Sequence, residues 1–218
     1  ETKSKVAPID RHALVTRHNI TWNQVEGQIP LGNGEFCFNA DGTGLQTFGG
    51  STMSHWGWHS FPLPEGVSPD QIPATGTFQK GRNTGPDVFP AGTNAIRSWM
   101  YDNPHSFNFC RIRFMKAGGK ELAPEDIKGL SRSYDLWSGL HISKFSIEGQ
   151  TVQVVTCVNP NLDELAVKIE SPMLKNGAIE LAIDFPYPSL QRNKPWVGDF
   201  EHPAGNDNLL VTENVSAQ

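Results

Sequence analysis

Cysteine is scarce in this sequence of 218 residues. The three cysteines are Cys37, Cys110 and Cys157, and no C-x-x-C spacing occurs among them. Each lies in an apolar, strand-like stretch, where a cysteine packs as a small hydrophobic group. An odd number without paired spacing also argues against a disulfide framework. We therefore expect buried free thiols rather than disulfides.

Basic residues are few and scattered. The chain has 18 Lys and Arg against 23 Asp and Glu, a formal net charge of −5, and no run of basic residues. Nucleic-acid binding needs a clustered basic surface that neutralises phosphates, and anionic membranes attract polybasic segments. No stretch approaches the ~20 apolar residues that span a bilayer. We expect neither a nucleic-acid partner nor a membrane partner.

The common catalytic and cofactor signatures are also missing. There is no G-x-S-x-G elbow, no P-loop and no H-E-x-x-H. The Gly32-Asn33-Gly34 stretch lacks the third glycine and the βαβ context of a dinucleotide site. Glycoside hydrolysis requires paired carboxylates, and no spacing among the scattered acids nominates an acid and a base. The sequence predicts no catalytic residue and no cofactor.

A metal site is not expected either. His55 and His59 lie four residues apart, a spacing that would let them share a metal ion on a helix. Gly57 between them and the strand-like context argue against a helix there. We therefore interpret the two histidines as polar loop residues.

Glycine and proline are abundant, with 21 and 16 residues, and aromatic residues make up 10% of the chain. This composition favours short strands joined by many turns. The predicted fold class is mostly β: one large antiparallel β-sandwich over residues 1–218, with at most one or two short helices. A Pro/Gly-rich stretch over 61–104 interrupts the strand pattern, and we expect an ordered loop layer with a functional role.

Strand patterns are clearest in the second half of the chain. Residues 140–147 and 150–158 alternate in hydrophobicity on either side of a Glu148-Gly149 turn, which predicts a hairpin. Two further alternating runs cover 165–169 and 179–185, and another strand is predicted at 209–212. The only helix signal is at 121–128, where a proline and acidic residues suit a first helical turn.

The first half predicts a shorter hairpin. Residues 35–39 read as a strand, the 41–44 stretch (DGTG) as a turn, and 45–48 as the returning strand. Residues 54–60 then gather Trp56 and Trp58 with polar side chains. Sugar rings have an apolar C–H face that stacks on such residues, and their hydroxyls bind Asn, Asp, Glu, His and Arg. Burial in the core is the competing interpretation of either tryptophan.

Several stretches resemble the N-terminal β-sandwich domain of glycoside hydrolases of families 65 and 95. The first is IPLGNGEF at 29–36, followed by GLQTFGG at 44–50 and MSHWG at 53–57. The second is SYDLWSG at 133–139, continued by VNP at 158–160 and LAVKI at 165–169. Together they cover about half of the chain, and the 61–104 stretch has no counterpart in the pattern.

The resemblance implies a supersandwich similar to galactose mutarotase, packed on a separate catalytic (α/α)6 barrel. The chain would then be the N-terminal part of a longer enzyme that acts on oligo- or polysaccharides and is inactive alone. Its partners would be carbohydrate and its own catalytic domain. The chain opens without an initiator methionine, which predicts a removed signal sequence and a secreted or periplasmic protein. The residues expected to wall the sugar cleft are Asn33, Glu35, His55, Trp56, Trp58 and His59.

Two alternatives stay open at this point. One is a stand-alone carbohydrate-binding module, which exposed Trp56 and Trp58 side chains would favour. The other is a sugar epimerase of the mutarotase type, whose general acid and base face each other across the sugar ring. His105, His141 and Glu148 lie near predicted strands, but nothing in the sequence pairs them.

Overall fold

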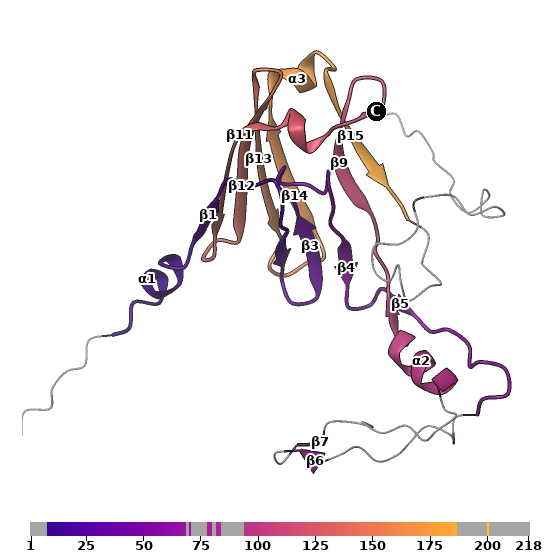
Figure 1. Ribbon diagram of the computed structural model, residues 1–218. Coiled ribbons are helices and arrows are strands. Elements are labelled where there is room, and N and C mark those ends of the chain that lie inside the picture. Colours follow the sequence, from indigo (N-terminus) through magenta and orange to yellow (C-terminus); the bar gives the residue numbers. More distant parts are fainter. Residues whose placement is uncertain are drawn as a thin grey trace, which may run out of the picture.

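The computed structural model describes residues 8–68, 70, 78–79, 82–83, 94–186 and 200, with the side chains of 59, 78–79, 82–83 and 94 left out. These residues form a mostly β, antiparallel sandwich, as the sequence predicts (Figure 1). The 209–212 strand and much of the 61–104 stretch lie outside the described residues.

The first layer is a five-stranded antiparallel sheet in the order β1-β11-β12-β13-β14. Its central hairpin has the predicted bounds and pairs Phe145 with Val152. Alternate residues of these strands are buried, because successive side chains point to opposite faces of a sheet. The strands are β1 (Ile20–Trp22), β11 (Lys128–Asp135), β12 (Leu140–Ile147), β13 (Gln150–Val158) and β14 (Leu165–Glu170).

The second layer combines two three-stranded groups, β2-β3-β4 and β10-β9-β15. The groups are joined by backbone hydrogen bonds, among them one from the Phe109 amide to the Thr52 carbonyl at 2.7 Å. Their strands are β2 (Ile29–Gly32), β3 (Phe36–Ala40), β4 (Thr52–Ser54), β9 (Arg111–Lys116), β10 (Lys120–Glu121) and β15 (Ile179–Asp184).

The core lies between the two layers in two clusters. In the larger one, Phe114 of β9 meets Phe145 of β12 edge to face, with ring centroids 6.2 Å apart. In the smaller one, buried residues of β2 and β3 pack against Val158 and Leu165 of the opposite sheet. An aromatic pair of this geometry contributes ~0.5–1.5 kcal/mol beyond burial of its area. The same clusters fix how the two layers face each other.

Residues 41–49 form a buried loop between the layers, not the returning strand predicted at 45–48. Ser143 donates a hydrogen bond to the Gly42 carbonyl at 2.6 Å, and Thr156 donates one to the Gly44 carbonyl at 2.7 Å. Side chains of the facing sheet thus satisfy backbone groups that a strand would have paired. The strand that returns beside β3 is β4, which begins at Thr52, seven residues after the predicted start.

The described chain has three short α-helices, where the sequence predicted at most two. They are α1 (Arg11–Thr16), α2 (Asn94–Asp102) and α3 (Pro172–Lys175). The predicted 121–128 helix is reduced to the 3-10 turn η2 (Pro124–Asp126), because β10 and β11 take up the residues on either side. No helix among the described residues has the length and apolarity to cross a membrane.

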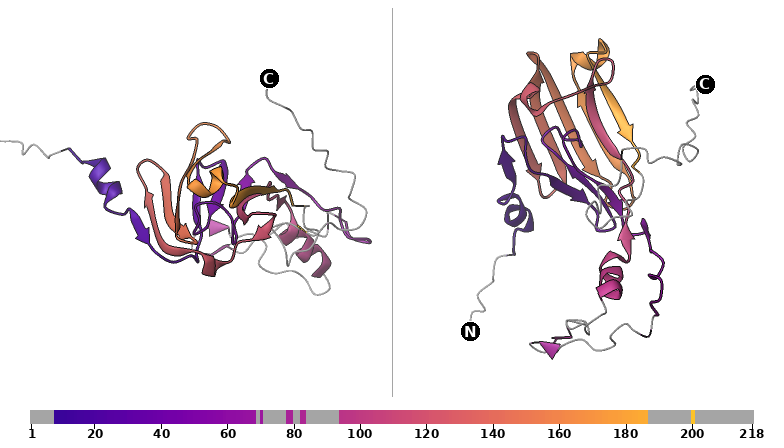
Figure 2. Two further views of the ribbon diagram at one scale, coloured as in Figure 1. Left: turned by 90° about the horizontal axis from the view of Figure 1, so that it is seen from above. Right: turned by 45° about the vertical axis from the view of Figure 1, so that its right-hand side comes forward.

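The helices occupy opposite ends of the sandwich. Figures 1 and 2 show α3 at one end, where it connects the two layers, while α1 and α2 project from the other end. Beside α2, the short strands β5 (Trp58–His59) and β8 (His105–Ser106) pair with each other. A second small pair, β6 (Phe78–Gln79) and β7 (Arg82–Asn83), lies within the Pro/Gly-rich stretch. The three cysteines are unpaired and half-buried rather than fully buried.

Candidate functional site

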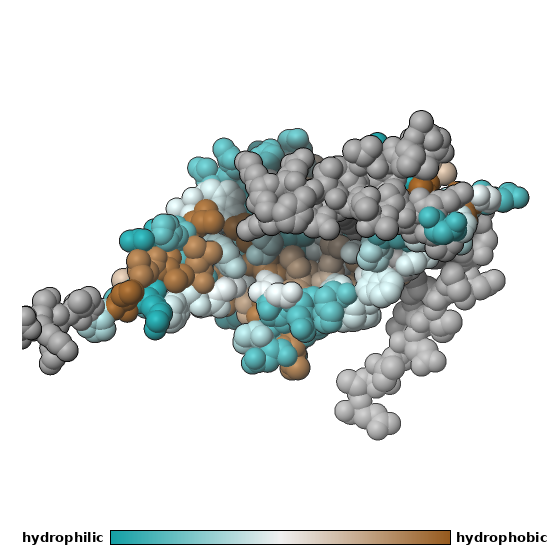
Figure 3. Space-filling model, turned by 90° about the horizontal axis from the view of Figure 1, so that it is seen from below, coloured by the Kyte–Doolittle hydropathy of each residue, from teal (hydrophilic) through white to brown (hydrophobic). Residues whose placement is uncertain are grey.

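Most of the predicted site residues meet at the end of the sandwich opposite α3. Asn33 and Glu35 lie in the turn between β2 and β3, and His55 and Trp56 follow β4 directly. The loop between β13 and β14 reaches the same place and contributes Asp163. Figure 3 looks onto this end and shows a hollow whose deeper atoms are largely apolar, with polar residues along its lower side.

Asn33 fixes the loops of the site. Its side-chain amide donates to the carbonyls of Asn159 at 3.1 Å and Leu162 at 3.0 Å. Its side-chain oxygen accepts the amides of Glu35 at 2.9 Å and Phe36 at 2.8 Å. With both ends of the amide engaged, Asn33 joins the β2–β3 turn to the β13–β14 loop. The structure therefore places it as a positioning residue, not as a residue that offers free groups to a ligand.

Asp163 is the residue that sequence reasoning missed. Its Oδ2 atom accepts hydrogen bonds from the Ser54 hydroxyl at 2.7 Å and from the Trp56 indole at 2.8 Å. These bonds, with that from Ser54 the strongest influence, lower the pKa of Asp163, and the nearby His55 lowers it further. The carboxylate thus holds the indole of Trp56 in one orientation. No sequence signal marks it, because 107 residues separate the two partners.

Trp56 and Trp58 present large aromatic surfaces to solvent, with 60% and 53% of each residue exposed. The ring of Trp56 packs against Phe109 with centroids 4.7 Å apart. Gly57 makes this contact possible, since a Cβ there would lie 2.2 Å from the Phe109 ring. Both tryptophans are therefore surface residues rather than core residues, and the Phe109 ring supports the Trp56 indole on its protein side.

Glu35 and His55 form an exposed pair next to Trp56. Their side chains approach to 3.9 Å between Oε2 and Nδ1, and the His55 amide donates to the Glu35 carbonyl at 2.8 Å. His59 belongs to β5, but its side chain lies outside the described part of the chain. Among the described residues, no three His, Cys, Asp or Glu side chains could hold a metal ion together.

No family model and no curated protein matches the chain. The site itself offers two exposed indoles, an oriented carboxylate, and a second carboxylate beside an imidazole.

The residues weighed for an epimerase do not come together. His141 is fully buried on the inner face of β12, and His105 is buried in β8. Glu148 lies in the β12–β13 turn, at the opposite end of the sheet from the β13–β14 loop. Glu35 and His55 contact each other, so they leave no room for a sugar ring between them.

His141 belongs instead to a buried polar cluster. The Arg132 guanidinium lies 4.1 Å from the Trp22 ring centre, and its amino groups donate to the carbonyls of Gln24, Glu26 and Gly27. Burial lowers the pKa of Arg132 to about 10. His141 stacks on the same indole at 5.8 Å. In the described part of the chain, neither His141 ring nitrogen has a hydrogen-bond partner.

Proposed function

We propose that this chain is a non-catalytic, carbohydrate-binding β-sandwich domain, and that its sugar site is the group formed by Glu35, His55, Trp56, Trp58 and Asp163. The observation that carries the proposal is the exposure of Trp56 directly beside the Asp163 carboxylate and the Glu35–His55 pair, with a second exposed tryptophan, Trp58, two residues along the chain. Exposed aromatic rings beside convergent polar groups are typical of ligand sites.

The physical argument rests on the two kinds of group that a sugar requires. The apolar C–H face of a pyranose removes the exposed indole surface from water, which is favourable in proportion to the area buried. The hydroxyls then need planar polar partners, and Glu35 and His55 are exposed next to the ring. Because Asp163 and Phe109 already fix Trp56, little side-chain freedom is lost when a sugar binds.

The family part of the proposal rests on the sequence resemblance. We infer that the domain belongs to a secreted or periplasmic glycoside hydrolase and packs on its catalytic barrel, where the Trp56 loop walls the sugar cleft. The two-layer antiparallel architecture is compatible with the sandwich expected for such a domain. The exposure of Trp56 and Trp58 also favours the second candidate, a carbohydrate-binding module that works without a barrel.

A glycan titration of the 218-residue chain tests the proposal. We expect binding of a neutral oligosaccharide, and Trp56→Ala to weaken it about tenfold or more, which corresponds to about 1.4 kcal/mol. Trp137→Ala is the matched control: Trp137 is 53% exposed in the β11–β12 turn, beside His12. Equal losses in both variants, or no binding of any glycan by a folded chain, would contradict a site at Trp56.

Binding by the isolated chain also separates the two candidates. A carbohydrate-binding module binds glycan with full affinity without any further domain. A cleft wall contributes part of a site, so its affinity rises when the downstream catalytic domain is present.

A further inference from the structure

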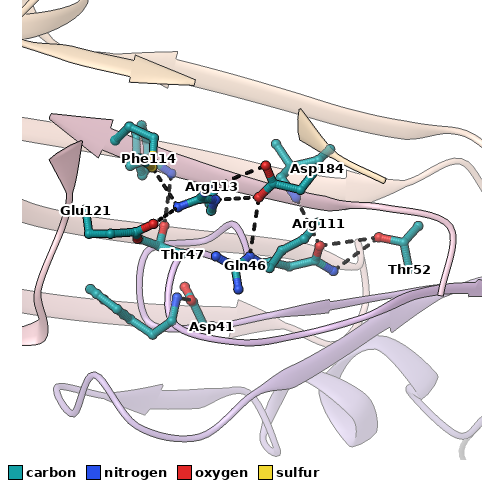
Figure 4. A network of polar contacts seen from close by, with 12 residues as sticks. Asp41, Gln46, Thr47, Thr52, Arg111, Arg113, Phe114, Glu121 and Asp184 are labelled. Carbon is teal, nitrogen blue, oxygen red and sulfur yellow. Dashed lines mark hydrogen bonds and ion pairs between the residues drawn. The ribbon is translucent and has the colours of Figure 1, made fainter. Parts of the chain in front are cut away.

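A separate cavity of about 390 Å³ lies beside β9 and β15. Arg111 and Arg113 alternate along β9 with Ile112 and Phe114, which pack into the core, so the two arginines project from the opposite face of the layer. Asp184 and Phe185 line the cavity from the end of β15, and Glu121 lines it from β10. Figure 4 shows the two arginines beside Asp184, with Glu121 on the far side of Arg113.

The donors of Arg113 are already engaged. Its Nε donates to Asp184 and its Nη1 to Glu121, each at 2.5 Å. Arg111 is different: its Nε lies 3.8 Å from Asp184 Oδ2 and is buried without a hydrogen-bond partner in the described part of the chain. A buried donor without a partner is costly, so a rotation of the Arg111 guanidinium that lets it donate to a ligand oxygen in the cavity is favoured.

The charges of the cavity balance. Two guanidinium groups, Arg111 and Arg113, face two carboxylates, Asp184 and Glu121. An anionic ligand would be repelled by the two carboxylates, and a cationic ligand by the two guanidinium groups. A neutral hydroxyl, in contrast, can accept a hydrogen bond from a guanidinium and donate one to a carboxylate.

One wall of the cavity is apolar. Phe185, just beyond the end of β15, lines the cavity and is 53% exposed. The Arg111 guanidinium lies 5.2 Å from the ring centre of Phe200. A sugar needs both kinds of group found here. Its C–H face can stack on the aromatic side chain, and its hydroxyls can bind the guanidinium and carboxylate groups.

We propose that this cavity is a second carbohydrate site, which takes a neutral sugar unit. Its volume lies within the range of about 300–1,000 Å³ that small-molecule sites occupy. Phe109, which supports Trp56, precedes Arg111 by two residues, a backbone distance of at most about 7 Å. The two proposed sites are therefore close to each other along this segment of the chain. The second site nevertheless uses its own residues, so it can be tested apart from the Trp56 site.

The test titrates the 218-residue chain with gluco-, manno-, xylo- and galacto-hexasaccharides, and with hexagalacturonate as the acidic comparison. We expect a neutral hexasaccharide to bind, and Phe185→Ala and Arg111→Gln each to weaken it at least fivefold. Leu181→Ala is the matched control, because Leu181 lies on the same strand, is 47% exposed and does not line the cavity. Phe185 lies beyond the end of β15 and is exposed, so its truncation leaves the fold intact.

Each outcome decides the proposal. Wild-type affinity in Phe185→Ala and Arg111→Gln overturns it, as does tighter binding of hexagalacturonate or no binding of any neutral hexasaccharide. Loss on Trp56→Ala alone supports the first site and overturns the second. Loss on Phe185→Ala and Arg111→Gln, with Trp56→Ala unaffected, supports the second site and contradicts the first.

Discussion

Acidification should destabilise the fold through His141. Burial, together with the positive charge of the neighbouring Arg132, lowers the pKa of this histidine from 6.5 to about 4. The unfolded chain exposes the imidazole, which then takes up a proton below pH 6.5. Between pH 6.5 and about 4 the unfolded state therefore binds more protons than the folded state, and the free energy of unfolding falls with pH.

The size of this effect follows from the same two values. One pKa unit corresponds to about 1.4 kcal/mol. The fall in the pKa of His141 from 6.5 to about 4 therefore adds about 3 kcal/mol to the free energy of unfolding near neutral pH. This contribution is fully present above pH 6.5, declines as the pH falls, and changes no further below about pH 4. Domains of this size are stable by about 5–15 kcal/mol, so such a loss is readily measured.

Urea unfolding at several pH values between 7.5 and 4 measures the effect, with His141→Leu as the comparison. Leucine removes the titrating group and the two unpartnered nitrogens while it keeps an apolar side chain in the core. We expect the free energy of unfolding of the wild type to fall by about 3 kcal/mol relative to the variant across this range. All other titrating groups are common to both proteins and cancel. Parallel pH curves for the two proteins would refute the reasoning.

Three further changes test the buried loop and the candidate site. Gly44→Ala should lower the free energy of unfolding by well above 1 kcal/mol, because φ is +82° and the new Cβ would lie 2.9 Å from a β13 side chain. Gly118→Ala, where the new Cβ meets open space, should lower it by about 1 kcal/mol. Thermal melts of the two variants measure the difference. Ser143→Ala should lower the free energy of unfolding by about 1–3 kcal/mol, because it leaves the buried Gly42 carbonyl without a hydrogen bond. Ser146→Ala is the control and should have a smaller effect in urea unfolding, because the hydrogen bond of Ser146 is exposed. Asp163→Asn should weaken glycan binding less than Trp56→Ala does, because it loosens the indole without removing it; an equal or larger loss would make Asp163 itself a sugar ligand.

The strands of the second half were predictable because their signals are local. The β12–β13 hairpin needs only alternation and the Glu148-Gly149 turn, and its observed bounds match the predicted ones. Helix α3 carries a local signal as well: Ser171 caps it by accepting the Met173 amide, and Pro172 begins it. That helix could have been found from the sequence.

The prediction failed where distant residues decide the conformation. Residues 45–48 alternate like a strand, yet their backbone groups bond to the distant Ile112 carbonyl and to Asp41 and Thr43 of the same loop. The candidate site shows the same limit. Chemistry indicated Trp56 and Trp58, but the orienting Asp163 and the supporting Phe109 arrive from other parts of the fold.

The buried loop also sets an order for folding. Its hydrogen bonds to Ser143 and Thr156 close separations of 101 and 112 residues, whereas the β12–β13 hairpin closes across two turn residues. Contacts between distant residues require large loops of chain to close first, which slows folding. We therefore expect the hairpin to form early and the loop to reach its place only when the second layer docks. Substitutions in the loop should accelerate unfolding while they leave the folding rate nearly unchanged.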